Sequence, residues 1–118
     1  MQVSKQIVNK NLEKEILAMY FQLLVDIKDP EEAKTFSLDV LGKDESWAIA
    51  KRLAVAYYLA NNRSYTNIKD NLKVSSATIA TVDKDRKNKG YSLALKKIQA
   101  DKWASEWSSK IQSLFKKK

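Results

Sequence analysis

The side chains with which this chain can do chemistry are amines, carboxylates and hydroxyls, because its 118 residues include no histidine and no cysteine. Thiol nucleophiles, disulfides, most zinc sites and histidine-based triads are therefore excluded. The acidic pairs Glu31-Glu32 and Asp44-Glu45 each stand at an expected helix start, where carboxylates complement the positive end of the helix dipole. We therefore predict that the chain is not an enzyme and that it holds no metal and no cofactor.

The basic residues are distributed unevenly along the chain. The net charge is +8, yet residues 1–62 hold 8 Lys/Arg against 9 Asp/Glu, whereas residues 63–102 hold 10 against 4. Such an asymmetry favours a polyanionic partner, with a merely solvated basic surface as the alternative. The cations that we expect to contact phosphates are Arg63, Lys84, Arg86, Lys87 and Lys89. Asp83 and Asp85 lie among them and are expected to point away from a phosphate backbone.

A small polar cluster, VSSAT at residues 74–78, separates two short segments with helical apolar spacing. Ile68 and Leu72 precede it, and Ile79 and Val82 follow it. Two short helices joined by a three- or four-residue turn form a helix-turn-helix. We predict helices over residues 65–72 and 76–85, with Tyr65 also facing inward, Val74 filling the angle between the helices and Ser64 and Ser75 as N-caps.

The second helix of this motif carries short side chains where it would meet a partner. Ser76, Ala77 and Ala80 permit a close approach, and Thr78 and Thr81 offer hydroxyls and methyls to base edges, thymine methyls or phosphates. Residue 73 in the turn is a position at which a left-handed backbone is usual, and this backbone costs a non-glycine residue about 1 kcal/mol or more. The alternative is an ordinary αα-hairpin with a polar outer face.

The elements that must position the motif are predicted to be helices, because the chain has only two glycines and one proline and so lacks the turns of a sandwich or barrel. A wide apolar stripe predicts a helix over residues 11–28, and Asp29-Pro30 predicts the start of the next helix. A long helix is predicted from Lys43 to Ala60. After Gly90, which we expect to break the pattern, a last helix is predicted from about Ser92.

The whole chain is therefore predicted to be one all-α domain, residues 1–118, of about six helices. Its parts are core or dimerisation helices at 11–62, the helix-turn-helix at 64–85 and a C-terminal helix at 92–115. The tryptophans Trp47, Trp103 and Trp107 are predicted to pack inside the protein, although Trp103 and Trp107 also have the spacing for stacking on single-stranded bases. The polar N-terminal segment and the absence of a long apolar run predict a cytoplasmic protein that does not enter a membrane.

Two segments of the sequence resemble the tryptophan repressor superfamily, in particular its Trp-repressor-like branch. These are DVLGKDESWAIAKRLAVAYYLANN, which is similar to the long helix of that family, and SYTNIKDNLKVSSATIATV, which is similar to its helix-turn-helix. The resemblance covers about two fifths of the chain directly. It implies an all-helical, intertwined homodimer whose two recognition helices enter successive major grooves of double-stranded DNA.

The resemblance also implies roles for single residues. Lys69 matches a basic DNA-contacting position on the first helix of the motif, and Thr66 stands where the repressor has an arginine. Arg52 matches an arginine of the tryptophan pocket, whereas Gly42 and Thr81 replace a pocket threonine and the second pocket arginine. A carboxylate needs a charged or well-directed donor, so these departures disfavour tryptophan as a co-repressor and leave any other small-molecule effector open.

The sequence thus predicts a homodimeric transcriptional regulator, a repressor by resemblance, that binds double-stranded DNA sequence-specifically. The predicted DNA-binding residues are Arg63, Thr66, Lys69, Ser75, Ser76, Ala77, Thr78, Ala80, Thr81, Lys84 and Lys87, with Arg52, Gly42 and Thr81 in a possible effector pocket. Two alternatives remain at this stage. One is a basic helical protein that binds RNA or DNA without sequence preference, and the other is a helical bundle that binds proteins.

Overall fold

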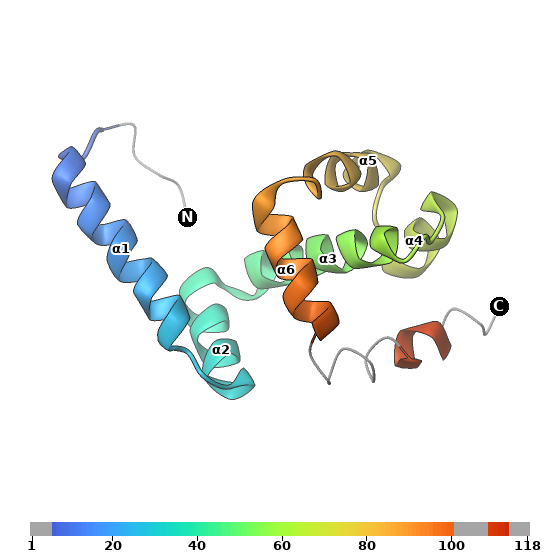
Figure 1. The fold of residues 1–118 in the computed structure, drawn as a ribbon, viewed down its shortest axis with the longest axis horizontal. Coiled ribbons are helices and arrows are strands. Elements are labelled where there is room, and N and C mark those ends of the chain that lie inside the picture. Colours follow the sequence, from blue (N-terminus) through green and yellow to red (C-terminus); the bar gives the residue numbers. More distant parts are fainter. Residues whose placement is uncertain (1–5, 101–108, 114–118) are drawn as a thin grey trace. The chain divides into compact units, whose positions relative to one another are not determined.

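The computed structural model describes residues 6–100 and 109–113, and this part of the chain contains helices and no strand (Figure 1). The elements are α1 (Lys10–Asp26), α2 (Pro30–Phe36), a π-helical turn η1 (Ser37–Leu41), α3 (Lys43–Ala60), α4 (Tyr65–Leu72), α5 (Ser76–Asp85) and α6 (Lys89–Ala100). Residues 109–113 are also helical. The all-α prediction is confirmed. By its internal contacts the chain divides into an N-terminal unit, Met1–Lys43, and a C-terminal unit, Asp44–Lys118.

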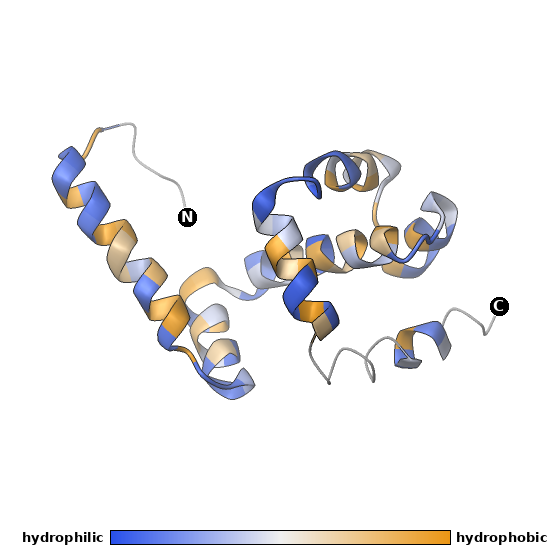
Figure 2. Cartoon of the chain, viewed as in Figure 1, coloured by the Kyte–Doolittle hydropathy of each residue, from blue (hydrophilic) through white to orange (hydrophobic). Residues whose placement is uncertain are grey.

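In the N-terminal unit the capping residues set the helix boundaries. The side chain of Asn9 accepts from the amides of Asn11 and Leu12 at the start of α1, and Asp29 accepts from the amide of Glu32 at the start of α2. The predicted start at Asp29-Pro30 is thereby confirmed. None of the α1 residues is buried, and in Figure 2 apolar and polar residues alternate along this helix. A helix of this kind draws its stability from tertiary packing of its apolar face.

The core of the C-terminal unit forms around the second half of α3. Five consecutive α3 residues, Val55–Leu59, are buried together with Ile68 of α4 and with Ile79 and Val82 of α5. Side chains of α6, including Leu95 and Ile98, pack against this core and are half-buried. The helix-turn-helix is therefore attached to the end of α3 by its own apolar residues. The predicted stop of α3 is also confirmed, because Asn62 adopts a left-handed backbone with φ 63°.

Three predictions about these elements are wrong. Trp47 is 61% exposed because it lies in the first half of α3, before the stretch on which α4 and α5 pack. Tyr65 is 40% exposed because its ring lies at the edge of the motif, with its hydroxyl directed to Asp83. Gly90 does not interrupt a helix but lies in the first turn of α6, where the amide of Ser92 already bonds to the carbonyl of Asn88.

The predicted C-terminal helix includes residues that the structure describes and residues outside the described part of the chain. Ile111 packs against the core of the C-terminal unit. Trp103 and Trp107 lie outside the described residues, so their predicted packing stays a prediction. In the described part of the chain, the helices are too short or too polar to cross a membrane.

Candidate nucleic-acid interface

The helix-turn-helix forms where the sequence predicts it, with a capping serine at the start of each helix. The hydroxyl of Ser64 accepts from the amide of Asn67 at 3.1 Å, and that of Ser75 accepts from the amide of Thr78 at 3.1 Å. Between the helices, Lys73 has φ 55° and ψ 49°, which is the left-handed conformation that the motif requires at this position. Both predicted N-caps and the predicted backbone of the turn are confirmed.

Three fully buried side chains fix the angle between α4 and α5. Ile68 and Ile79 are 0% exposed and Val82 is 2% exposed. Leu72 and Val74 pack against them from the end of α4 and from the turn, which confirms that Val74 fills the angle between the helices. Because all the apolar residues of α5 that reach the core lie on one side, the opposite side of α5 is directed outward.

A polar clamp joins the first residue of α4 to the last turn of α5. The hydroxyl of Tyr65 donates to Asp83 Oδ2 at 2.7 Å, and Arg86 Nε donates to Asp83 Oδ1 at 2.8 Å. Arg86 and Tyr65 together lower the pKa of the Asp83 carboxyl, and the bond to Asp83 raises the pKa of the Tyr65 hydroxyl. Asp83 therefore stays ionised, and the adjacent charge of Arg86 balances its own, so it repels a phosphate backbone less than an unpaired carboxylate would.

The outward face of α5 is made of short side chains followed by one cation. Ala77, Ala80, Thr81 and Lys84 are exposed and follow the i, i+3, i+4, i+7 spacing of one helix face, opposite Ile79 and Val82. Ser76, also exposed, precedes them in the first turn. We refer to these five exposed residues, Ser76, Ala77, Ala80, Thr81 and Lys84, as the α5 face. No larger apolar side chain and no acid belongs to it.

Most hydroxyls at the start of α5 are bonded within the protein. Thr81 Oγ1 donates to the carbonyl of Ala77 at 3.0 Å, and the oxygens of Ser75 and Thr78 lie 3.0 Å apart as a hydrogen-bonded pair. The predicted DNA-contacting residues Ser75 and Thr78 are exposed, but their side chains take part in the hydrogen bonds that cap the start of α5. Thr78 also lies to the side of the α5 face, where it lines a hollow together with Arg52.

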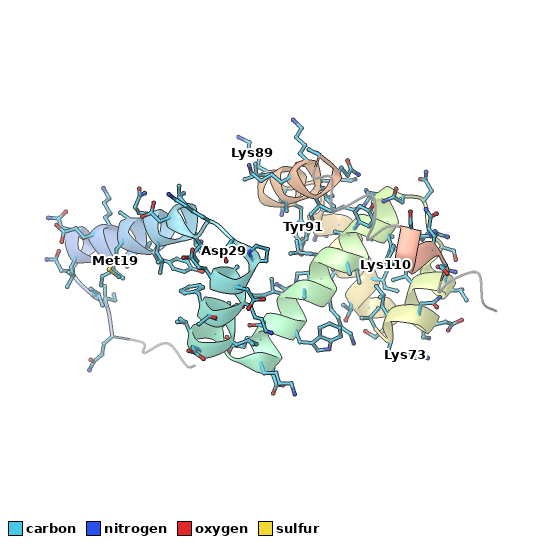
Figure 3. The ribbon with its side chains drawn as sticks, turned by 90° about the horizontal axis from the view of Figure 1, so that it is seen from below. Met19, Asp29, Lys73, Lys89, Tyr91 and Lys110 are labelled. Atoms are coloured by element: carbon cyan, nitrogen blue, oxygen red, sulfur yellow. The ribbon has the colours of Figure 1, made fainter. Side chains whose placement is uncertain are left out.

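Exposed cations on the neighbouring elements accompany the α5 face. Lys69 of α4, with Thr66 one turn before it, is exposed, and Lys87 is exposed just beyond α5. Lys89 begins α6, and Figure 3 shows its side chain extending away from the ribbon. Arg63 is only half-exposed and already interacts within the protein, so it is less available to a phosphate than the lysines are.

Two of the predicted effector residues, Arg52 and Thr81, do not line the same hollow. Arg52 is exposed and borders two shallow hollows, one of about 330 Å³ beside Lys73 and Ser75 and one of about 280 Å³ beside Tyr91. Burial raises the pKa of the Tyr91 hydroxyl, and the charge of Arg52 partly opposes this effect. Thr81 is not among the lining residues of either hollow, and its hydroxyl proton is used within α5.

Gly42, the third predicted effector residue, is the penultimate residue of the N-terminal unit and has φ 95°. A residue with a side chain rarely adopts this backbone conformation, although no atom lies within 4 Å of the place where its Cβ would be. A threonine is therefore disfavoured at this position by the backbone and not by crowding.

The comparison with protein families decides the assignment. A model of the family described as Trp repressor protein matches residues 15–99, which run from the second turn of α1 to the last turn of α6. The chain belongs to the Trp repressor protein family. This is a family of regulatory DNA-binding proteins with a helix-turn-helix. No curated protein and no solved structure gives a significant match.

Sequence reasoning missed two features of the motif. The Asp83–Arg86 pair has the i, i+3 spacing of a helical ion pair and was therefore detectable in the sequence, whereas the bond from Tyr65 depends on the angle between the helices. The second feature is a bond from Lys51 Nζ of α3 to the carbonyl of Lys73 at 3.4 Å, which ties the turn to the long helix.

Proposed function

We propose that this member of the Trp repressor protein family is a cytoplasmic, homodimeric transcriptional regulator that binds double-stranded DNA sequence-specifically through α5. The observation that supports this most directly is the α5 face itself. It is exposed and free of acids, and the polar clamp at Asp83 and the buried residues beneath it hold it at a fixed angle to α4. A helix with this surface fits the width of a major groove.

The exposed lysines of the motif also support binding to DNA. Lys69, Lys84 and Lys87 are exposed on three successive parts of the motif, and each phosphate that a lysine neutralises releases counterions. Phosphate contacts of this kind position a protein on the duplex, while sequence is read by the residues that reach base edges. The short residues of the α5 face are the candidates for that reading.

The proposed homodimer is supported by the N-terminal unit. On α1, the apolar side chains Leu12, Ile16, Leu17, Met19, Phe21, Leu23, Leu24 and Val25 are each between 43% and 74% exposed. Exposed apolar patches of this extent mark interaction sites. Covering the exposed half of these eight side chains contributes on the order of 6 to 12 kcal/mol, taking about 1.5–3 kcal/mol for each fully buried side chain. A second copy of the chain is the occupant that the family resemblance implies.

We further propose that DNA binding does not require tryptophan as a co-repressor. Thr81 supplies no charge for a carboxylate, and the left-handed backbone at Gly42 is unsuited to a threonine. Thermal unfolding in the presence of each free amino acid tests this, because a ligand that binds only the folded form raises the melting temperature. A rise of several degrees with tryptophan alone would contradict the proposal.

Selection from a pool of random DNA duplexes at about 150 mM salt tests the central proposal. The expected result is a site with two related half-sites about 10 base pairs apart, one for each subunit. Binding to every duplex without enrichment of a sequence would favour a non-specific nucleic-acid binder. Absence of binding at this salt concentration would favour a helical bundle that binds proteins.

A further inference from the structure

The chemistry of the α5 face restricts what it can read in a major groove. Guanine is usually recognised by arginine or lysine, and adenine by asparagine or glutamine. The first two turns of α5, residues 76–82, contain none of these four residue types. On the α5 face, Lys84 in the third turn is the first side chain with a long polar group. The beginning of this helix therefore lacks the side chains that usually recognise purines.

Two of the four hydroxyl protons at residues 75–81 are used within the protein. The proton of Thr81 is directed to the carbonyl of Ala77, and Ser75 and Thr78 are bonded to each other at the N-cap. What the α5 face presents outward from Ala77, Ala80 and Thr81 is therefore mainly methyl groups. Their small size also lets the helix backbone come close to the floor of the groove.

We propose that the α5 face recognises C5-methyl groups of pyrimidines in the major groove, with thymine as the base that supplies them. The proposal rests on the proposed DNA-binding function and names the chemical group that gives it sequence preference. Methyl groups of Ala77, Ala80 and Thr81 pack against the thymine methyl, which is the one apolar group that a base pair exposes in that groove. The preferred site is therefore predicted to contain thymines at the positions that α5 covers.

The experiment compares duplexes that differ only in methyl groups. A duplex selected from a random pool is resynthesised with deoxyuridine in place of single thymidines, which removes the methyl and keeps every hydrogen-bonding group. We expect binding to weaken roughly fourfold for one methyl and roughly fifteenfold for a symmetric pair, from about 0.8 kcal/mol per apolar carbon removed from water. In a second arm, each critical T·A pair is replaced by C·G or by 5-methyl-C·G. We expect the methylated version to bind more tightly, because the methyl stays in the groove.

Variants of the protein assign the effect to the α5 face. Ala77→Ser adds a single hydroxyl to the Cβ and so makes this part of the α5 face polar with a small change in size, and it is expected to reduce the preference for thymidine over deoxyuridine. Lys87→Ala, as the matched control, is expected to weaken binding to both duplexes equally and to leave their ratio unchanged. Thermal unfolding of each variant confirms that it folds.

The possible failures are distinguishable. If the selected duplex binds equally well with deoxyuridine at every position, the methyl proposal is overturned while sequence-specific DNA binding stands. If Ala77→Ser and the equivalent variant Ala80→Ser both leave the thymidine-to-deoxyuridine ratio unchanged, the methyl is read by another part of the protein and the proposal for the α5 face is overturned. If no sequence is enriched from the random pool, the proposed function fails, and the methyl proposal fails with it.

Discussion

The turn of the helix-turn-helix offers a sharp test of how the motif is built. Lys73 has a left-handed backbone, with φ 55° and ψ 49°, where a residue with a Cβ meets its own carbonyl oxygen. This conformation costs an ordinary residue about 1–2 kcal/mol and costs glycine almost nothing. Lys73→Gly also increases the entropy of the unfolded chain, which offsets roughly 0.5–1 kcal/mol of that gain.

The net effect of Lys73→Gly is therefore a gain of about 0.5–1 kcal/mol in the free energy of unfolding. For a domain of this size, the gain corresponds to a rise of roughly 2–5 °C in melting temperature. The bond from Lys51 Nζ is retained in the variant, because it reaches the backbone carbonyl of residue 73 and not its side chain. Thermal unfolding followed by circular dichroism measures the difference.

Lys73→Ala is the matched control, because it removes the same charge and the same flexible side chain but keeps the Cβ. We expect its melting temperature to stay close to that of the unmodified protein. The difference between the glycine and alanine variants then isolates the cost of the left-handed backbone from the loss of charge. A melting temperature of the glycine variant below that of the alanine variant would refute the reasoning, because without strain at residue 73 only the entropic cost of glycine remains.

Four further predictions follow from the same contacts. Lys87→Ala is expected to lower the slope of log affinity against log salt by about 0.9 without changing the selected sequence, as one lost phosphate contact requires, and an unchanged slope would remove Lys87 from the interface. Ile16→Glu is expected to shift the mass in solution, measured by light scattering, toward the 13.5 kDa of one chain, whereas Lys14→Gln, with the same change in charge, leaves it unshifted. Burial raises the pKa of the Tyr58 hydroxyl above its unfolded value of about 10, so its contribution to the free energy of unfolding is complete below that pH and decreases as the pH rises above it. Tyr58→Phe is expected to reduce this decrease in thermal unfolding between about pH 9 and 11. Arg86 lowers the pKa of Asp83, so the stabilisation from this carboxylate is present above about pH 3.8 and is lost as the pH falls through its folded value; the difference in melting temperature between the protein and Asp83→Asn is expected to shrink in acid, and a constant difference would contradict the pairing.

The parts of the fold that the sequence predicts well are those with local causes. The helix-turn-helix boundaries follow from Ser64 and Ser75, whose hydroxyls cap the helices next to them, and from apolar residues at helical spacing. The left-handed turn follows from the length of the connection. Such signals act within one or two turns of the chain, so they do not depend on how distant elements pack.

The parts that the sequence does not predict depend on tertiary packing. Trp47 has the spacing of a core residue but lies before the stretch of α3 on which the motif packs, so it remains 61% exposed. Glycine often interrupts helices, yet Gly90 lies within the first turn of α6. The free-energy cost of a glycine is small there, because few intrahelical hydrogen bonds are formed in a first turn. Tyr65 resembles a core residue until the angle between α4 and α5 directs its hydroxyl to Asp83.

In the candidate site, too, some features are predictable from the sequence and others depend on contacts in the folded structure. The sequence predicts Ala77, Ala80 and Thr81 on the outward face together with Thr78, whereas in the structure Thr78 lies beside that face and lines a hollow. Which hydroxyls remain available to a partner depends instead on short-range bonds, such as that from Thr81 to the carbonyl of Ala77. The sequence predicted threonine hydroxyls and methyls as equivalent ligands, and the geometry distinguishes between them.

The measurement that tests the central claim most directly compares the sequences selected from a random duplex pool by the unmodified protein and by Ala77→Arg. Ala77 lies on the α5 face and has a small side chain, so an arginine at this position extends outward without disturbing the core. If α5 lies in the major groove, the variant is predicted to select guanine at one new position in each half-site, where arginine binds O6 and N7. An unchanged selected sequence with unchanged affinity would contradict the account, because it would place α5 outside the interface with DNA.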